Sequence, residues 1–243
     1  MIAGFEDEAT ARTAAAALGR AHGDLAGLAK SLVVEPVDPS NWVDATTTGR
    51  VDIDGQRITF DVGPAFGHGA HPTTSLALAL AALAIAPGDA VLDFGAGTGV
   101  LTLAAARFGA KRLVAIENDP DALAVARGNL APLSNEPATE IEVVEVLPPI
   151  PAITGTGRRG ARFDVILANV LLPVHVEHGR QLIGRLTPSG SLIVSGLLVE
   201  QEEQLLAAYL GLHVENRLVD GDWLALALGR SEPGSESESV PER

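Results

Sequence analysis

The sequence predicts an α/β fold: a doubly wound, mostly parallel sheet of seven strands with helices on both faces, after a small α+β appendage. From residue 73 onward, short apolar segments alternate with helical segments, as in repeated βαβ units. Three alternating glycines follow the first of these apolar segments. Near the end, two strand segments flank Asp220-Gly221, which predicts an antiparallel hairpin at one edge of the sheet.

Composition limits the class of protein. With 243 residues, 47% of them hydrophobic, the chain is long enough for one large domain plus a small appendage. It has no cysteine, which excludes disulfides, thiolate metal sites and a cysteine nucleophile. The net charge of −14 argues against direct contact with nucleic acid through a general basic surface and suits a basic partner.

The two ends of the chain differ from the middle. Residues 1–60 predict a small substrate-recognition-like region with a helix over 8–18, a strand over 32–35 and a hairpin around Asp54-Gly55. Residues 231–243 are polar and of low complexity, so we expect a disordered tail. No targeting or membrane-spanning segment is recognised, so a cytoplasmic protein with no membrane contact is the expectation.

Residues 61–230 form the predicted main domain, and the elements of its first half are taken in order. An alanine- and leucine-rich run after two threonines predicts a helix, and the apolar run ending in Asp93-Phe94 predicts a buried strand. The next helix follows the glycines, a second apolar strand ends at Ile116, and Pro120 opens another helix with Asp119 as its N-cap. The expected ranges are 73–86, 90–94, 98–108, 112–116 and 120–130.

The second half repeats the alternation. Its strand segments are rich in Ile, Val and Leu, and its helical segments carry polar residues at helical spacing. A long segment rich in Pro, Gly and Arg, residues 147–162, predicts a loop between two of these strands. The expected strands are 141–146, 163–168, 191–195, 213–218 and 223–228, and the expected helices are 174–186 and 200–210.

The most informative motif is VLDFGAGTG over residues 91–99. Glycines allow a sharp turn and close approach of the backbone to a ligand, and the helix that follows offers free N–H groups. A dinucleotide fingerprint would read GxGxxG or GxGxxA, whereas here the glycines stand at 95, 97 and 99 and position 100 is Val. This spacing disfavours NAD and favours the nucleoside-binding variant of S-adenosylmethionine enzymes.

Two further strands end in polar residues. Glu117 ends the strand after the glycine motif, 22 residues beyond Gly95, where a carboxylate can accept hydrogen bonds from ribose hydroxyls. Asn169 ends the strand 163–168, which is apolar from Val165 to Ala168, and ligands of doubly wound sheets bind beyond this end. The residues after Asn169 are VLLP, without the aromatic side chain that would stack on a flipped base.

A glycine-rich segment, GPAFGHGAHPTT over residues 63–74, could fold over a ligand as a lid or could be an ordinary connector. It resembles the GxAFGTGxHxTT signature of the ribosomal protein L11 methyltransferases. The resemblance continues through the glycine motif, Glu117, Asn169, Ser195-Gly196-Leu197 and the Trp223 strand, and it covers about residues 61–230. It implies a bacterial, cytoplasmic, Rossmann-like class I methyltransferase that methylates amino groups of one ribosomal protein.

The resemblance implies that Thr74, Gly95, Glu117 and Asn169 contact S-adenosylmethionine. Together with the glycine motif, the resemblance defines candidate residues for cofactor binding and for catalysis. The candidate cofactor-binding residues are Thr74, Asp93, Gly95, Gly97, Gly99, Glu117 and Asn169, and the candidate catalytic residues are Phe66, His71 and Asn169. The histidine pairs 68/71 and 175/178 have only Glu177 as a carboxylate at ligand spacing, so no metal is expected.

The chain departs from the family in three respects. His68 replaces the usual Thr of the lid, Glu117 stands where many members have Asp, and only about sixty residues precede the signature. Three functions therefore stay open: methylation of an amino group, such as that of a lysine, in ribosomal protein L11 or a related basic protein; methylation of a small-molecule amine; and cofactor binding without catalysis.

Overall fold

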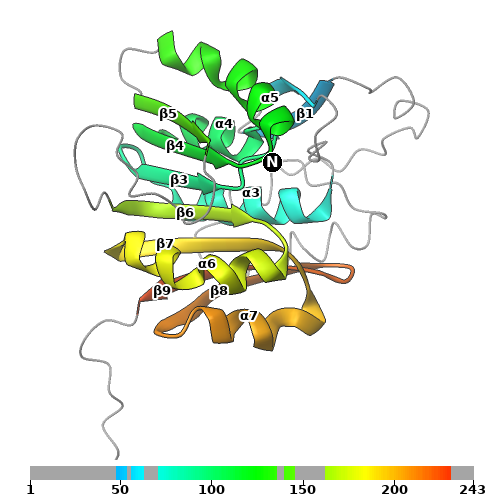
Figure 1. The fold of residues 1–243 in the computed structure, drawn as a ribbon, viewed down its shortest axis with the longest axis vertical. Helices are drawn as coiled ribbons and strands as arrows, with labels where there is room; N and C mark the ends of the chain where they lie inside the picture. The colour runs from blue at the N-terminus through cyan, green and yellow to red at the C-terminus, as the bar shows by residue number, and fades with distance from the viewer. Residues whose placement is uncertain (1–47, 54–55, 63–70, 136–139, 146–161, 231–243) are drawn as a thin grey trace, which may run out of the picture.

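The computed structural model describes residues 48–53, 56–62, 71–135, 140–145 and 162–230. The predicted helix 8–18, the strand 32–35 and the tail 231–243 lie outside these ranges. The main body is a seven-stranded sheet in the order β5-β4-β3-β6-β7-β9-β8 (Figure 1). Its strands are β3 Ala90–Phe94, β4 Arg112–Glu117, β5 Glu140–Glu145, β6 Phe163–Asn169, β7 Leu186–Leu198, β8 Leu212–Asp220 and β9 Trp223–Arg230.

The sheet has the predicted topology. Strands β5, β4, β3, β6 and β7 run parallel, whereas β9 pairs antiparallel with both β7 and β8. The chain moves outward from β3 to β4 and β5 and then crosses back to place β6 on the other side of β3. This reversal is a topological switch point, and ligands of doubly wound sheets bind beyond the carboxyl ends of the strands there.

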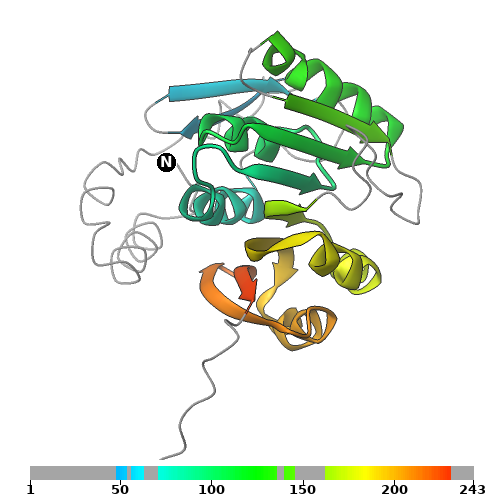
Figure 2. The same cartoon turned by 90° about the vertical axis from the view of Figure 1, so that its left-hand side faces the viewer.

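Helices cover both faces of the sheet (Figures 1 and 2). On one face α3 (Pro72–Ala84), α4 (Val100–Arg107) and α5 (Pro120–Leu130) pack with strand residues such as Val91. On the other face α6 (Leu172–Arg185) and α7 (Glu202–Ala208) pack with residues such as Leu92. Successive strand residues thus point to opposite cores, which explains why these strands read as continuous apolar runs.

A two-stranded hairpin, β1 (Thr48–Ile53) and β2 (Gln56–Asp61), joins the α3–α5 face. Val51 and Phe60 are buried in the same core as α4. Asn129 of α5 fastens the end of the hairpin: its Oδ1 accepts from the Asp61 N–H at 2.8 Å, and its Nδ2 donates to the carbonyl oxygens of Asp61 and Thr98, each at 2.8 Å. The same side chain therefore links the hairpin to the glycine-rich turn after β3.

Several boundaries differ from the prediction, and three of them have a clear structural basis. Helix α4 begins at Val100 instead of residue 98, because Gly99 is left-handed (φ 81°) and forms its N-cap. Helix α6 begins at Leu172 instead of residue 174, since its proline lies in the first turn, where a missing N–H costs nothing. Strand β7 extends from Leu186, which pairs with Phe163 across a register shift.

Short 3-10 helices complete the described fold: η2 (Ala131–Asn135) follows α5, and η3 (Val199–Gln201) precedes α7. Within the described ranges, no helix has the length and apolarity needed to cross a membrane.

Candidate active site

The candidate site lies at the carboxyl ends of β3, β4 and β6. After β3, the N–H groups of Gly95 and Ala96 both donate to the Ile116 carbonyl at 2.9 Å, so the glycine-rich turn is hydrogen-bonded to β4. Gly95, Gly97 and Gly99 have φ values of 76°, 55° and 81°, a region that residues with a Cβ rarely adopt. These glycines are therefore required by the backbone path itself.

Close packing adds a second reason for glycine at position 95. A Cβ there would lie 2.4 Å from Cγ1 of Val170, the residue directly after Asn169. The turn after β3 and the turn after β6 are thus in contact across the switch point. This contact brings two of the predicted site segments together.

Glu117, the last residue of β4, holds the glycine turn. Its side chain is buried, its Oε2 accepts from the Gly97 N–H at 2.7 Å, and its Oε1 accepts from the N–H groups of Asn118 and Asp119 at 2.8 and 2.9 Å. Asp119 in turn caps α5, as predicted, accepting from Asp121 N at 2.8 Å. The carboxylate is therefore fixed by backbone donors from the turns after β3 and β4.

Asp93 is the second buried acid of the site. It is 1% exposed, and its Oδ2 accepts a hydrogen bond from the Thr102 hydroxyl at 2.6 Å. Burial raises the pKa of Asp93 to about 6, partly opposed by the hydrogen bonds from Thr102. Its Oδ1 has no hydrogen-bond partner, and neither has the buried Thr98 hydroxyl on the glycine turn. Unpartnered buried polar atoms mark a place where a polar ligand or water is needed.

Asn169 and Thr74 meet at the carboxyl end of β6. Asn169 ends β6, Thr74 lies in the first turn of α3, and Asn169 Nδ2 donates to Thr74 Oγ1 at 3.4 Å. Because the amide NH₂ is used in this way, the Asn169 carbonyl oxygen remains available as an acceptor. Residues 95 positions apart in sequence thus form one wall of the site.

His71 is the N-cap of α3. Its Nδ1 accepts from the Thr73 N–H at 3.4 Å and lies 2.8 Å from Thr73 Oγ1, and its ring packs edge-on against Trp223 at 4.7 Å. Burial lowers the pKa of His71, which favours the neutral ring. Phe66, the other predicted lid residue, lies outside the described residues.

Sequence reasoning missed several residues of the site. Thr102 carries the hydrogen bond to Asp93, and Ser195 on β7 donates to the carbonyl of Thr73 at 2.9 Å. His175, noted in the sequence only as half of a histidine pair, instead contacts Tyr209 Oη at 2.7 Å. Among the described residues, no group of three or more side chains could hold a metal ion.

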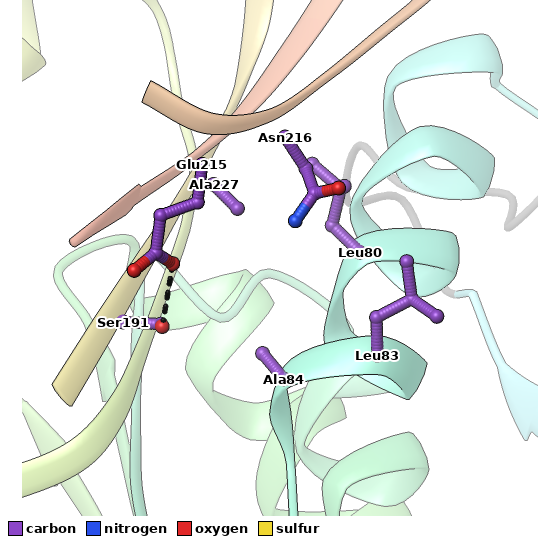
Figure 3. A pocket seen from close by; sticks show the side chains of 7 residues that line it. All are labelled: Leu80, Leu83, Ala84, Ser191, Glu215, Asn216 and Ala227. Atoms are coloured by element: carbon purple, nitrogen blue, oxygen red, sulfur yellow. Dashed lines mark hydrogen bonds between the residues drawn. The ribbon is translucent and has the colours of Figure 1, made fainter. Parts of the chain in front are cut away.

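A cavity of about 210 Å³ lies elsewhere, between the second half of α3 and strands β7, β8 and β9 (Figure 3). The Ser191 hydroxyl donates to Glu215 Oε2 at 3.1 Å at its edge. The lining residues are Leu80, Leu83, Ala84, Ser191, Glu215, Asn216 and Ala227. Ser191 pairs with Val165, four residues before the carboxyl end of β6, so this cavity is separate from the predicted site.

The strand order, the glycine turn after β3, the acid that ends β4 and the asparagine that ends β6 together define the class I methyltransferase fold. The chain belongs to the ribosomal protein L11 methyltransferase (PrmA) family, whose model matches residues 32–231.

Individual relatives agree with this assignment. The chain is 40% identical over 181 residues to the ribosomal protein L11 methyltransferase of Pelobacter propionicus, covering 72% of this chain and 55% of that protein. It is 41% identical over 172 residues to that of Geobacter metallireducens, covering 70% and 53%. The chain therefore spans about half the length of the curated relatives it matches.

A solved structure supports the same fold. The ribosomal protein L11 methylase of Lactobacillus delbrueckii subsp. bulgaricus aligns with a TM-score of 0.59 and 26% identity, over 70% of this chain and 84% of that one.

Proposed function

We propose that this chain binds S-adenosylmethionine at the carboxyl ends of β3, β4 and β6 and transfers its methyl group to an amino group of ribosomal protein L11. The observation that carries the proposal is the buried Glu117 at the end of β4, tied at 2.7 Å to the glycine turn after β3. Membership of the family supports the choice of acceptor.

The residues present fit the cofactor. A carboxylate has about four acceptor positions, and backbone N–H groups occupy three at Glu117, which leaves capacity for a ribose hydroxyl. The free Oδ1 of Asp93 suits the ammonium group of the methionine part, because a nearby cation stabilises an ionised carboxylate. Gly95, Gly97 and Gly99 keep side chains away from the turn that would cradle the ligand.

S-adenosylmethionine supplies a methyl group on a sulfonium that is already a good leaving group, so the protein contributes mainly alignment. The carbonyl oxygen of Asn169 can accept an N–H from a neutral amine and so orient the nitrogen lone pair. A desolvated acceptor pocket favours the neutral form of a lysine amine, because burial lowers the pKa of the amine. We propose His71, at the start of α3, and Phe66 as further residues that shape the acceptor side.

The charges of the described residues support a basic protein partner. Acids follow the carboxyl ends of several strands: Asp119 and Asp121 after β4, Glu200 after β7 and Asp222 after β8. Arginines stand at the opposite edge, at the starts of β4, β6 and β7 and at the end of β9: Arg112, Arg162, Arg185 and Arg230. Opposite charge at the edge of the site would steer a basic protein toward it.

The test offers the full chain three acceptor samples with radiolabelled S-adenosylmethionine: purified ribosomal protein L11, a protein-free metabolite extract and buffer. We expect label on L11, and loss of that label in Asn169→Ala but not in Asn135→Ala, a matched change at an exposed asparagine in η2. Label found only in the metabolite sample would favour a small-molecule amine. Binding of S-adenosylhomocysteine without methyl transfer to any sample would favour a protein that binds the cofactor without catalysis.

A further inference from the structure

Ser195 connects the two elements that carry the acceptor side of the site. It is fully buried on β7, directly opposite Asn169 in the β6–β7 pairing. Its hydroxyl donates to the Thr73 carbonyl at 2.9 Å, at the start of α3. Its carbonyl oxygen accepts from the Val170 N–H at 3.2 Å, in the turn that follows Asn169. One residue is thus bonded to both neighbours of the Asn169–Thr74 contact.

A buried His–Tyr pair supports the Ser195 carbonyl. His175 Nε2 lies 3.1 Å from this carbonyl, which can only accept, so Nε2 carries the proton and donates. His175 Nδ1 then accepts from the Tyr209 hydroxyl at 2.7 Å. Burial lowers the pKa of His175 to about 4 and raises that of Tyr209, so both groups stay neutral at pH 7 and keep these roles.

Glycines allow the backbone segments around Ser195 and Tyr209 to approach each other closely. Gly196 has a φ of 86°, and a Cβ there would lie 2.5 Å from the Val170 carbonyl oxygen. A register shift between β7 and β9 falls at this point, between Val194 and Leu197. On α6, a Cβ at Gly179 would lie 2.6 Å from the Ala208 carbonyl, so α6 and α7 approach closely beside Tyr209. The register shift between Val194 and Leu197 is the kind of irregularity that commonly redirects side chains next to a functional site.

We propose that Ser195, held by His175 and Tyr209, is a positioning residue that sets the distance between Asn169 and Thr74 and thereby the geometry of the acceptor pocket. The inference rests on the function proposed above. The Asn169–Thr74 hydrogen bond is long, at 3.4 Å, so its geometry depends on the elements that carry the two residues. The Glu117–Gly97 contact involves neither Ser195 nor its partners, so the cofactor contacts proposed for Glu117 and the glycine turn do not depend on this cluster, whereas those expected of Thr74 and Asn169 do.

The competing explanation is that the cluster only stabilises the fold. The two explanations differ in what Ser195→Ala changes. A positioning role predicts a fall in the rate of methyl transfer that exceeds any loss of cofactor affinity, since a displacement of about 1 Å in an acceptor pocket can cost about 10²-fold in rate. A purely structural role predicts lower stability with an unchanged turnover of the folded fraction.

The test compares Ser195→Ala and Tyr209→Phe with Thr187→Val, which removes the hydroxyl that bonds to Asp164 at the opposite end of the same strand. We expect Ser195→Ala to lower kcat for L11 methylation at least about tenfold. Its Kd for S-adenosylhomocysteine should rise by a much smaller factor, because Glu117 and the glycine turn are unaltered. Tyr209→Phe should give a smaller loss of kcat, because it keeps the ring and removes only the bond to His175. Thr187→Val should leave kcat unchanged.

Amide hydrogen exchange gives a readout that needs no activity. We expect faster exchange of the Thr74 and Ser75 amides, which bond to the His71 carbonyl, in Ser195→Ala but not in Thr187→Val. If Ser195→Ala matches Thr187→Val in both kcat and exchange, the positioning role is wrong. If the unaltered chain methylates no L11, the proposed function fails. Faster exchange confined to these amides, with the free energy of unfolding unchanged, would then support the positioning role, and faster exchange throughout the sheet would support a purely structural role.

Discussion

Replacing Glu117 by Gln is expected to weaken cofactor binding strongly while changing the volume of the side chain very little. The carboxylate accepts three backbone N–H groups at 2.7, 2.8 and 2.9 Å. In Gln one oxygen becomes an NH₂ group, which cannot accept. If the remaining oxygen keeps Asn118 and Asp119, the new NH₂ faces the Gly97 N–H, so the bond to the glycine turn is lost. The charged acceptor proposed for a ribose hydroxyl is lost with it.

Hydrogen bonds to charged groups are worth about 1.5–3 kcal/mol, and each 1.4 kcal/mol is tenfold in affinity. We therefore expect the Kd for S-adenosylhomocysteine, measured by titration calorimetry, to rise about 10–100-fold in Glu117→Gln. Glu140→Gln is the matched control, because it removes the same charge from an exposed side chain at the start of the neighbouring strand. A Kd for Glu117→Gln equal to that of Glu140→Gln would remove Glu117 from the cofactor site.

Three further predictions concern stability, each measured by urea unfolding. The pKa of Asp93 is raised from 3.8 to about 6, so the folded state binds a proton there more tightly than the unfolded state. Stability should therefore fall by at most about 3 kcal/mol as the pH rises from 4 through 6, and Asp93→Asn should flatten this fall. Gly95→Ala should cost about 2–4 kcal/mol, from its positive φ and its clash with Val170, and Val170→Ala should recover only the clash. Asn129→Ala removes three hydrogen bonds and should cost about 2–4 kcal/mol; a loss below about 0.5 kcal/mol would mean that the hairpin is not held there.

Local patterns were enough to predict the sheet and most of its elements. Alternating apolar and helical segments give a βαβ fold, and the N-cap Asp119 followed by Pro120 in the first turn fixes where α5 begins. Boundaries that depend on backbone conformation, such as the left-handed Gly99 before α4, could not be predicted with the same accuracy.

The hydrogen bonds of the site could not be read from the sequence, because they join distant residues. Ser195 and Thr73 are 122 residues apart, and Asn129 and Asp61 are 68 apart. The sequence predicts that Glu117 binds a ribose hydroxyl. Its hydrogen bond with the Gly97 N–H could not be predicted, because it depends on the pairing of β3 with β4. No local pattern contains this information, since it arises only when the strands are in register.

The most direct test of the proposed function is the mass of ribosomal protein L11 after incubation with the full chain and S-adenosylmethionine, followed by peptide mapping. We expect methyl groups on amino groups of L11 in the reaction with the unaltered chain. We expect their loss with Asn169→Ala, although this variant should still bind S-adenosylhomocysteine. An unmodified L11 at high enzyme concentration, under conditions where the chain binds the cofactor, would rule out the proposed function.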